Sequence, residues 1–228
     1  MTPDFWSRFP QAGCLPYNCN CELIHQGWIY QPSAFWSSLI YIILGVVLWK
    51  KVPQKTQLLK IFIFFVIAQG IFSQFAHGTF LKLALAMDFA GIIVIISFFT
   101  VIKFWKKNFA LKFFIYYAFL LGVFYSLHLW VKVALCVLIF VISITDIINS
   151  LKGEFKTSKT LHQSLSLLFV SFTFFLVDET KLICVPETWL QGHSIWHFGS
   201  AYAIYLYGKW RFLEREPFKA MRDNEIKL

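Results

Sequence analysis

The chain has 228 residues, of which 58% are hydrophobic, 20% are aromatic and only 14% are charged, and its net charge is +9. Soluble domains usually carry about 25% charged residues, so this chain has too few charges to cover a soluble globule of its size. The composition excludes an ordinary soluble protein and indicates an all-α membrane protein whose surface largely faces lipid.

Long apolar runs follow an N-terminal segment, residues 1–33, that lacks the basic start and apolar core of a cleavable signal. A helix needs roughly 20 residues to cross a hydrocarbon core of about 30 Å. The runs predict transmembrane helices over residues 34–50, 57–77, 82–103, 109–127, 130–149, 160–178 and 191–210. The fourth and fifth runs leave little room for a turn between them, so six spans with one long kinked helix is the alternative.

The positive charges alternate along the chain, as expected when lysine and arginine collect at the cytoplasmic ends of spans. This alternation requires an odd number of spans and supports seven, with the N-terminus outside and a cytoplasmic tail over residues 211–228. We therefore expect a single seven-helix domain, residues 1–228, integral to the membrane. Attraction to anionic headgroups explains the net charge, and no motif for nucleic-acid binding is present. The basic residues expected on the cytoplasmic side are Lys50, Lys51, Lys55, Lys60, Lys103, Lys106, Lys107, Lys112, Lys152, Lys156, Lys159, Lys209, Arg211, Arg215, Lys219, Arg222 and Lys227.

Four of the five cysteines, Cys14, Cys19, Cys21 and Cys184, fall on the predicted outer side. Cysteines in an oxidising compartment indicate disulfides. A bridge from Cys19 or Cys21 to Cys184 would tie the N-terminal segment to the last outer loop, although the spacing does not fix the pairing. Metal binding by Cys14 with Cys19 or Cys21 is the alternative.

Five polar residues fall within the predicted spans, where ionisable groups are costly and usually mark function. Ser73 and His77 are four residues apart, as are His193 and His197, so each pair shares a helix face. Asp88 lies about 9 Å along its helix from the outer end. The predicted topology therefore brings all five residues to a similar depth in the outer half of the membrane.

Three imidazoles and one carboxylate at one level suit a zinc site. Catalytic zinc often takes three protein ligands and leaves its fourth position for water, whose pKa it can lower to about 7. Asp88 could then act as general base and acid, and Ser73 could donate a hydrogen bond to a developing oxyanion. An H-x-x-x-H pair could instead serve haem, copper or a proton relay.

The remaining histidines and the outer carboxylates are not expected to bind the metal directly. His25, His128 and His162 lie away from the cluster, so we assign them no ligand role. Asp178 could support a histidine of the cluster. Alternatively, Asp178 and Glu179 together could form a solvated helix end.

The motifs resemble those of the CREST superfamily, which includes alkaline ceramidases, progestin and adiponectin receptors, and lipid remodellers of GPI anchors. The order, the spacing and the seven-span frame cover nearly the whole chain, and the alkaline ceramidases are the most similar branch. The motifs are Cys21-Glu22, Phe35-Trp36-Ser37-Ser38, Ser73-x-x-x-His77, Asp88 and His193-x-x-x-His197.

This resemblance implies a role for each polar residue of the cluster. His77, His193 and His197 would bind zinc, Asp88 would be the acid–base residue, and Ser73 would assist the oxyanion. The resemblance also implies a disulfide between Cys21 and Cys184.

The chain departs from the ceramidases of the animal type at their calcium site. Glu22 matches that site, but Cys19 and Ala34 stand where carboxylates are expected, and Asp4 is too far upstream to replace them. We therefore expect no calcium site.

These observations lead us to expect a zinc-dependent intramembrane hydrolase that cleaves a lipid amide, as ceramidases do, or a lipid ester. Its partner would be a membrane lipid substrate. The alternative is a non-catalytic seven-helix lipid receptor with structural zinc, in which Asp88→Asn would retain function. A transporter or redox protein ranks third, and a haem absorption band would support it.

Overall fold

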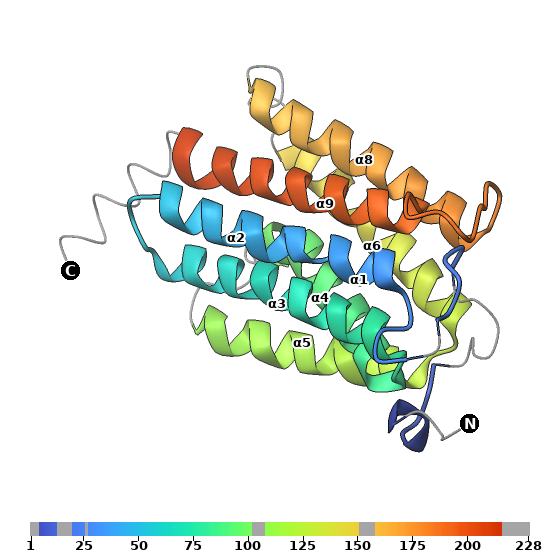
Figure 1. Cartoon of the computed structure of the whole chain (residues 1–228). Coiled ribbons are helices and arrows are strands. Elements are labelled where there is room, and N and C mark those ends of the chain that lie inside the picture. The colour runs from blue at the N-terminus through green and yellow to red at the C-terminus, as the bar shows by residue number, and fades with distance from the viewer. Residues whose placement is uncertain (1–4, 13–19, 26, 102–107, 151–157, 216–228) are drawn as a thin grey trace.

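The computed structural model describes residues 5–12, 20–25, 27–101, 108–150 and 158–215, and every regular element in these ranges is helical. Figure 1 shows the helices running side by side along one long axis, with η1 and η3 at opposite ends of the bundle. The elements are η1 (Phe5–Arg8), α1 (Pro32–Ser37), α2 (Leu39–Lys51), α3 (Gln57–Thr79), α4 (Lys82–Val101), α5 (Phe109–Ser126), α6 (Leu129–Ser150), α8 (Lys159–Glu179), α9 (Gly192–Lys209) and the π-helical turn η3 (Trp210–Glu214).

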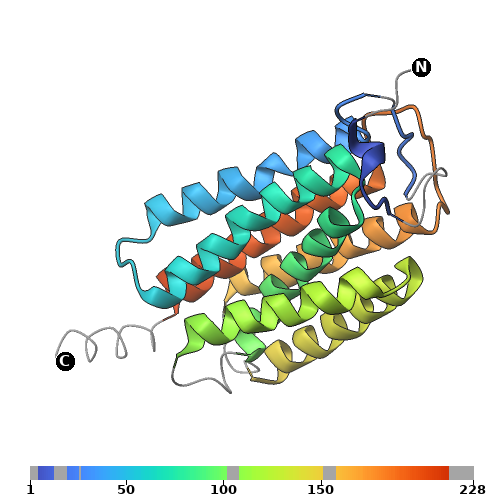
Figure 2. The same cartoon turned by 90° about the horizontal axis from the view of Figure 1, so that it is seen from below.

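Seven long helical segments coincide with the predicted spans, if α1 and α2 are counted together. Four segments in the described part of the chain are long and apolar enough to cross a membrane, namely Pro32–Lys51, Gln57–Thr79, Phe109–Ser126 and Lys159–Glu179. The number of spans and their orientation remain predictions. One long kinked helix in place of α5 and α6 is not observed, because the chain is extended at Leu127 and α6 turns back from the end of α5 (Figure 2).

The helix packing places α4 in the interior, in contact with α3, α5 and α6, while α9 packs between α2 and α8. Small residues allow the closest of these approaches. A Cβ atom at Gly199 would lie only 1.9 Å from Ser171 Oγ, so glycine lets α9 pack tightly against α8. Stacked aromatic rings fill the space between other helices, as in the pair Phe140 and Phe172, whose centroids are 4.3 Å apart.

Large apolar side chains also cover the outside of the bundle. Phe119 on α5 and Phe169 on α8 are each about two-thirds exposed, at 65% and 66%. A surrounding lipid phase would solvate such side chains, whereas in water their exposure would be unfavourable.

The N-terminal segment folds over the end of the bundle where α3 ends and α9 begins. Its backbone pairs with that end, since Tyr30 N–H donates to Gly78 O at 3.1 Å and Gln31 N–H donates to His77 O at 3.0 Å. A disulfide joins Cys21 to Cys184 in the α8–α9 loop. These links hold the N-terminal segment against the helix ends that carry the polar residues.

Candidate metal centre

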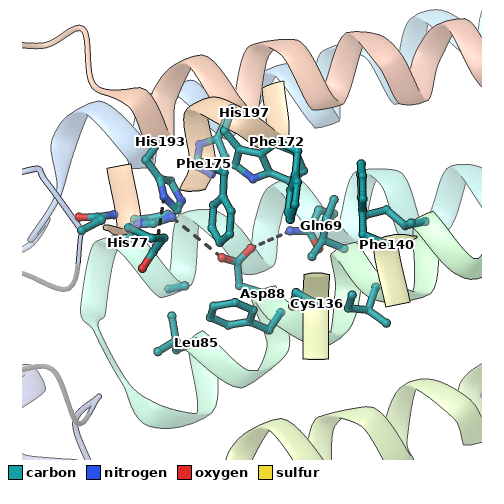
Figure 3. A pocket seen from close by; sticks show the side chains of 18 of the residues that line it. Gln69, His77, Leu85, Asp88, Cys136, Phe140, Phe172, Phe175, His193 and His197 are labelled. Atoms are coloured by element: carbon teal, nitrogen blue, oxygen red, sulfur yellow. Dashed lines mark hydrogen bonds and ion pairs between the residues drawn. The ribbon is translucent and has the colours of Figure 1, made fainter. Parts of the chain in front are cut away.

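The three histidines of the predicted cluster meet at one point between α3 and α9. Each offers a ring nitrogen, and these nitrogens all lie within 4.8 Å of one another. His77, His193 and His197 are buried, with exposures of only 4%, 6% and 2%. Figure 3 shows the rings turned toward one another above Asp88. Helical spacing explains the pair on α9, whereas the approach of His77 depends on the packing of α3 against the N-terminal segment.

The orientation of His77 is fixed by a buried glutamine. Its Nδ1 lies 2.9 Å from Gln31 Oε1. The amide nitrogen of Gln31 donates to Asn20 Oδ1 and to Glu22 O, so Oε1 is the acceptor and Nδ1 carries the proton. His77 Nε2 therefore keeps its lone pair, and it has no hydrogen-bond partner among the described residues.

His197 is oriented in the same way by a serine of α1. Ser37 Oγ donates to Ala34 O at 3.0 Å and lies 2.8 Å from His197 Nδ1, from which it accepts. The lone pair of His197 is thus on Nε2, which is 3.3 Å from Ser73 Oγ. His193 differs, because its Nδ1 is buried, has no hydrogen-bond partner in the part of the chain that the structure describes, and lies 3.7 Å from Glu179 Oε1.

Asp88 and Ser73 flank the three rings. Asp88 Oδ2 lies 4.0 Å from His77 Nε2, and Oδ1 accepts a hydrogen bond from Gln69 Nε2 at 2.7 Å. Ser73 Oγ accepts from Ser38 Oγ at 3.0 Å, which leaves its own proton available as a donor. All five residues selected from the sequence are therefore brought together, while their chemical roles remain proposals.

The carboxylates at the end of α8 require a correction. The prediction of a solvated helix end is wrong, because Asp178 and Glu179 are only 1% and 7% exposed. Among the described residues Asp178 makes no hydrogen bond to a histidine, and its Oδ2 instead accepts the Cys21 N–H at 3.1 Å. Glu179 is the carboxylate that faces His193.

Glu22 caps the start of α1. Its two carboxylate oxygens accept the backbone N–H groups of Ser33, at 2.6 Å, and of Ala34, at 3.0 Å. These N–H groups have no partner within their own helix, and a negative charge is favourable there. Burial raises the pKa of Glu22 above its usual value, and the two N–H groups act against this rise.

Several other predicted features can be located. The Cys21–Cys184 pairing that the resemblance implied is observed, and Cys136 is a buried free thiol. Cys14, Cys19 and Asp4 lie outside the described residues, as does any metal site built on Cys14. The three histidines left unassigned, His25, His128 and His162, are exposed and lie outside the cluster.

Sequence reasoning missed three glutamine and glutamate partners of the cluster, namely Gln31, Gln69 and Glu179. Gln69 carried a usable signal, because it precedes Ser73 by four residues and therefore shares its helix face. Gln31 and Glu179 lie at helix ends, and only the folded contacts relate them to histidines distant in the sequence.

A pocket extends from the three histidines between α3, α4, α6, α8 and α9. Its empty space, counted together with the open space at its mouth, is about 780 Å³. Asp88 and Glu179 line its polar end. Phe140, Phe172 and Phe175 line its walls (Figure 3). A ligand here would have a polar group beside the histidines and an apolar part among the aromatic rings.

Comparison of the chain with protein-family models, with curated proteins and with solved structures found no match.

Proposed function

We propose that this protein is a zinc-dependent intramembrane hydrolase that cleaves the acyl amide or ester bond of a membrane lipid. The observation that carries the proposal is the buried group of three histidines beside the Asp88 carboxylate. Two of the histidines have Nδ1 occupied by an acceptor, so each directs a lone pair into the cluster. Three imidazole nitrogens are a ligand set that catalytic zinc uses.

Bound zinc would supply Lewis-acid chemistry, polarising a substrate carbonyl and acidifying a water molecule. Asp88 would accept the proton of that water through Oδ2, while Gln69 holds Oδ1 and keeps the carboxylate oriented. Asp88 would then return the proton to the departing amine or alcohol. The Ser73 hydroxyl would donate to the oxygen that becomes negative in the transition state.

The pocket supports a lipid as substrate. Aromatic and aliphatic side chains continue from the polar end, so an acyl chain could lie among them with its carbonyl at the histidines. An amide is favoured by the resemblance to alkaline ceramidases, while the geometry suits an amide and an ester equally.

The test is hydrolysis of a panel of long-chain acyl amides and esters by detergent-purified protein whose zinc content is measured in the same sample. We expect turnover of at least one lipid class, and a loss of at least about 100-fold in Asp88→Asn because the general base is removed. Zinc-loaded protein that cleaves no member of the panel would overturn the proposal. Equal rates in Asp88→Asn would remove Asp88 from the mechanism.

A further inference from the structure

Glu179 is a buried carboxylate that the proposed reaction does not use. It is the last residue of α8, it is 7% exposed, and it lines the same pocket as the three histidines. Its Oε2 atom has no hydrogen-bond partner among the described residues, and its Oε1 atom lies 3.7 Å from His193 Nδ1. A buried carboxylate with an unpartnered oxygen is costly, so its presence at this point requires an explanation.

The other two histidines suggest what that explanation is. His77 Nδ1 is held by Gln31 Oε1 and His197 Nδ1 is held by Ser37 Oγ, at 2.9 and 2.8 Å. His193 Nδ1 is the third such nitrogen, and Glu179 Oε1 is the acceptor that faces it. A distance of 3.7 Å exceeds a hydrogen bond by less than 1 Å.

Charge balance points in the same direction. Three neutral imidazoles leave the two positive charges of a zinc ion uncompensated in a buried site, where unpaired charge is strongly unfavourable. Asp88 and Glu179 are the carboxylates that line the pocket. Asp88 lies next to His77, and Glu179 lies next to His193. Together they would balance the charge of the ion.

We propose that Glu179 is a positioning residue for the metal centre. Its carboxylate accepts the Nδ1 proton of His193, fixes the tautomer that leaves Nε2 for the metal, and places a negative charge behind that ligand. Carboxylates in this position orient metal-binding histidines and strengthen them as ligands. The inference rests on the proposed metal centre and concerns the binding of the ion, so it can be tested without a substrate.

The experiment is a zinc competition titration against a chelator, on the intact protein, Glu179→Gln and Glu179→Ala. Gln retains an oxygen acceptor without the charge, whereas Ala removes both. We expect zinc affinity to fall by about 10- to 100-fold in Glu179→Ala, with Glu179→Gln between Ala and the intact protein. If Glu179 only supported the fold, variants whose thermal stability is unchanged would bind zinc as tightly as the intact protein does.

Asp178→Asn is the matched control, because Asp178 is the adjacent buried carboxylate and it bonds to Cys21 N–H rather than to a histidine. Its zinc affinity should stay close to that of the intact protein. Intact protein that binds zinc no more tightly than folded Glu179→Ala would overturn the role of Glu179 alone. Intact protein that binds no zinc would instead overturn the metal centre on which the proposed function depends.

Discussion

Gln31 connects the N-terminal segment to the candidate metal centre through every polar atom of its side chain. Oε1 accepts from His77 Nδ1, and Nε2 donates to Asn20 Oδ1 and Glu22 O. The side chain is fully buried. A glutamine at the start of α1 therefore determines which nitrogen of His77 is available to a metal, although it is 46 residues away in the sequence.

Gln31→Ala should weaken both the fold and the metal centre. The His77 Nδ1–H would lose its acceptor, and a buried unpartnered donor costs roughly 1–3 kcal/mol. Zinc affinity should fall by about 10- to 100-fold, as is typical when the partner of a metal-binding histidine is removed. Thermal unfolding and zinc titration of the purified variant would measure the two effects.

Gln191→Ala is the control, because Gln191 is equally buried and precedes α9 as Gln31 precedes α1. Among the described residues, its side-chain amide donates to carbonyls of the α8–α9 loop, at Val185, Pro186 and Thr188, and to no histidine. It should lose stability while its zinc affinity changes little. Equal loss of zinc affinity in both variants would contradict a specific role for Gln31.

The helices were largely predictable from the sequence because apolar runs of about 20 residues dominate it. The run over 57–77 corresponds to Gln57–Thr79, and the run over 160–178 corresponds to Lys159–Glu179. The division of the first span into α1 and α2 was not predicted. Ser37 donates its hydroxyl proton to Ala34 O, three residues back, and such bonds often bend helices.

The candidate metal ligands were predictable for a different reason, namely that few polar residues interrupt those runs. Four-residue spacing identified the pairs Ser73 with His77 and His193 with His197. The partners that orient the rings were not predictable, because Gln31 and Glu179 lie in segments where polar residues are ordinary. Their roles depend on how α1 and α8 pack, which no local pattern encodes.

Ile96 on helix α4 lies between two pockets. It lines the pocket below the histidines and also a second pocket, which is lined by Ile95, Leu165 and Tyr207 as well. Eight residues separate Asp88 from Ile96, which is about 12 Å of helix. One acyl chain spans about 15 Å, half of the hydrocarbon core, so a chain held at Asp88 would reach Ile96.

Ile96→Trp should therefore shorten the acyl chain that the protein accepts. The larger ring would fill the far end of the pocket that Ile96 lines, so the rate should fall for long-chain lipids and be retained for short-chain ones. Relative rates across a chain-length series would measure this. Ile71→Trp is the control, since Ile71 is 52% exposed on α3, and its series should match that of the intact protein. An unshifted series in Ile96→Trp would contradict the assignment.

At the scale of the whole molecule, the two ends of the bundle differ in charge and chemistry. The end that holds α2 Lys51 and α9 Lys209 carries basic residues, with Lys51 Nζ bonded to Tyr205 OH at 2.9 Å. The opposite end carries the disulfide and the histidines (Figure 1). If positive charge marks the cytoplasmic side, the candidate metal centre lies in the outer half of the membrane.

Epitope insertion would test this orientation. A tag placed after Leu182, which is 76% exposed in the α8–α9 loop, should bind antibody on intact cells. A tag placed after Pro53, in the connection between α2 and α3, should bind only after permeabilisation. The reverse result would invert the predicted topology. Binding of both tags on intact cells would contradict the five spans, an odd number, that are predicted between the two tags.

The most direct measurement is the zinc content of the detergent-purified protein, by mass spectrometry, beside that of a His193→Ala, His197→Ala variant. We predict about one zinc per chain in the intact protein, because three histidine nitrogens converge within one buried site. The folded double variant should contain little, since it retains only one of the three. Intact, folded protein that was never exposed to a chelator and yet contains no zinc would contradict the account.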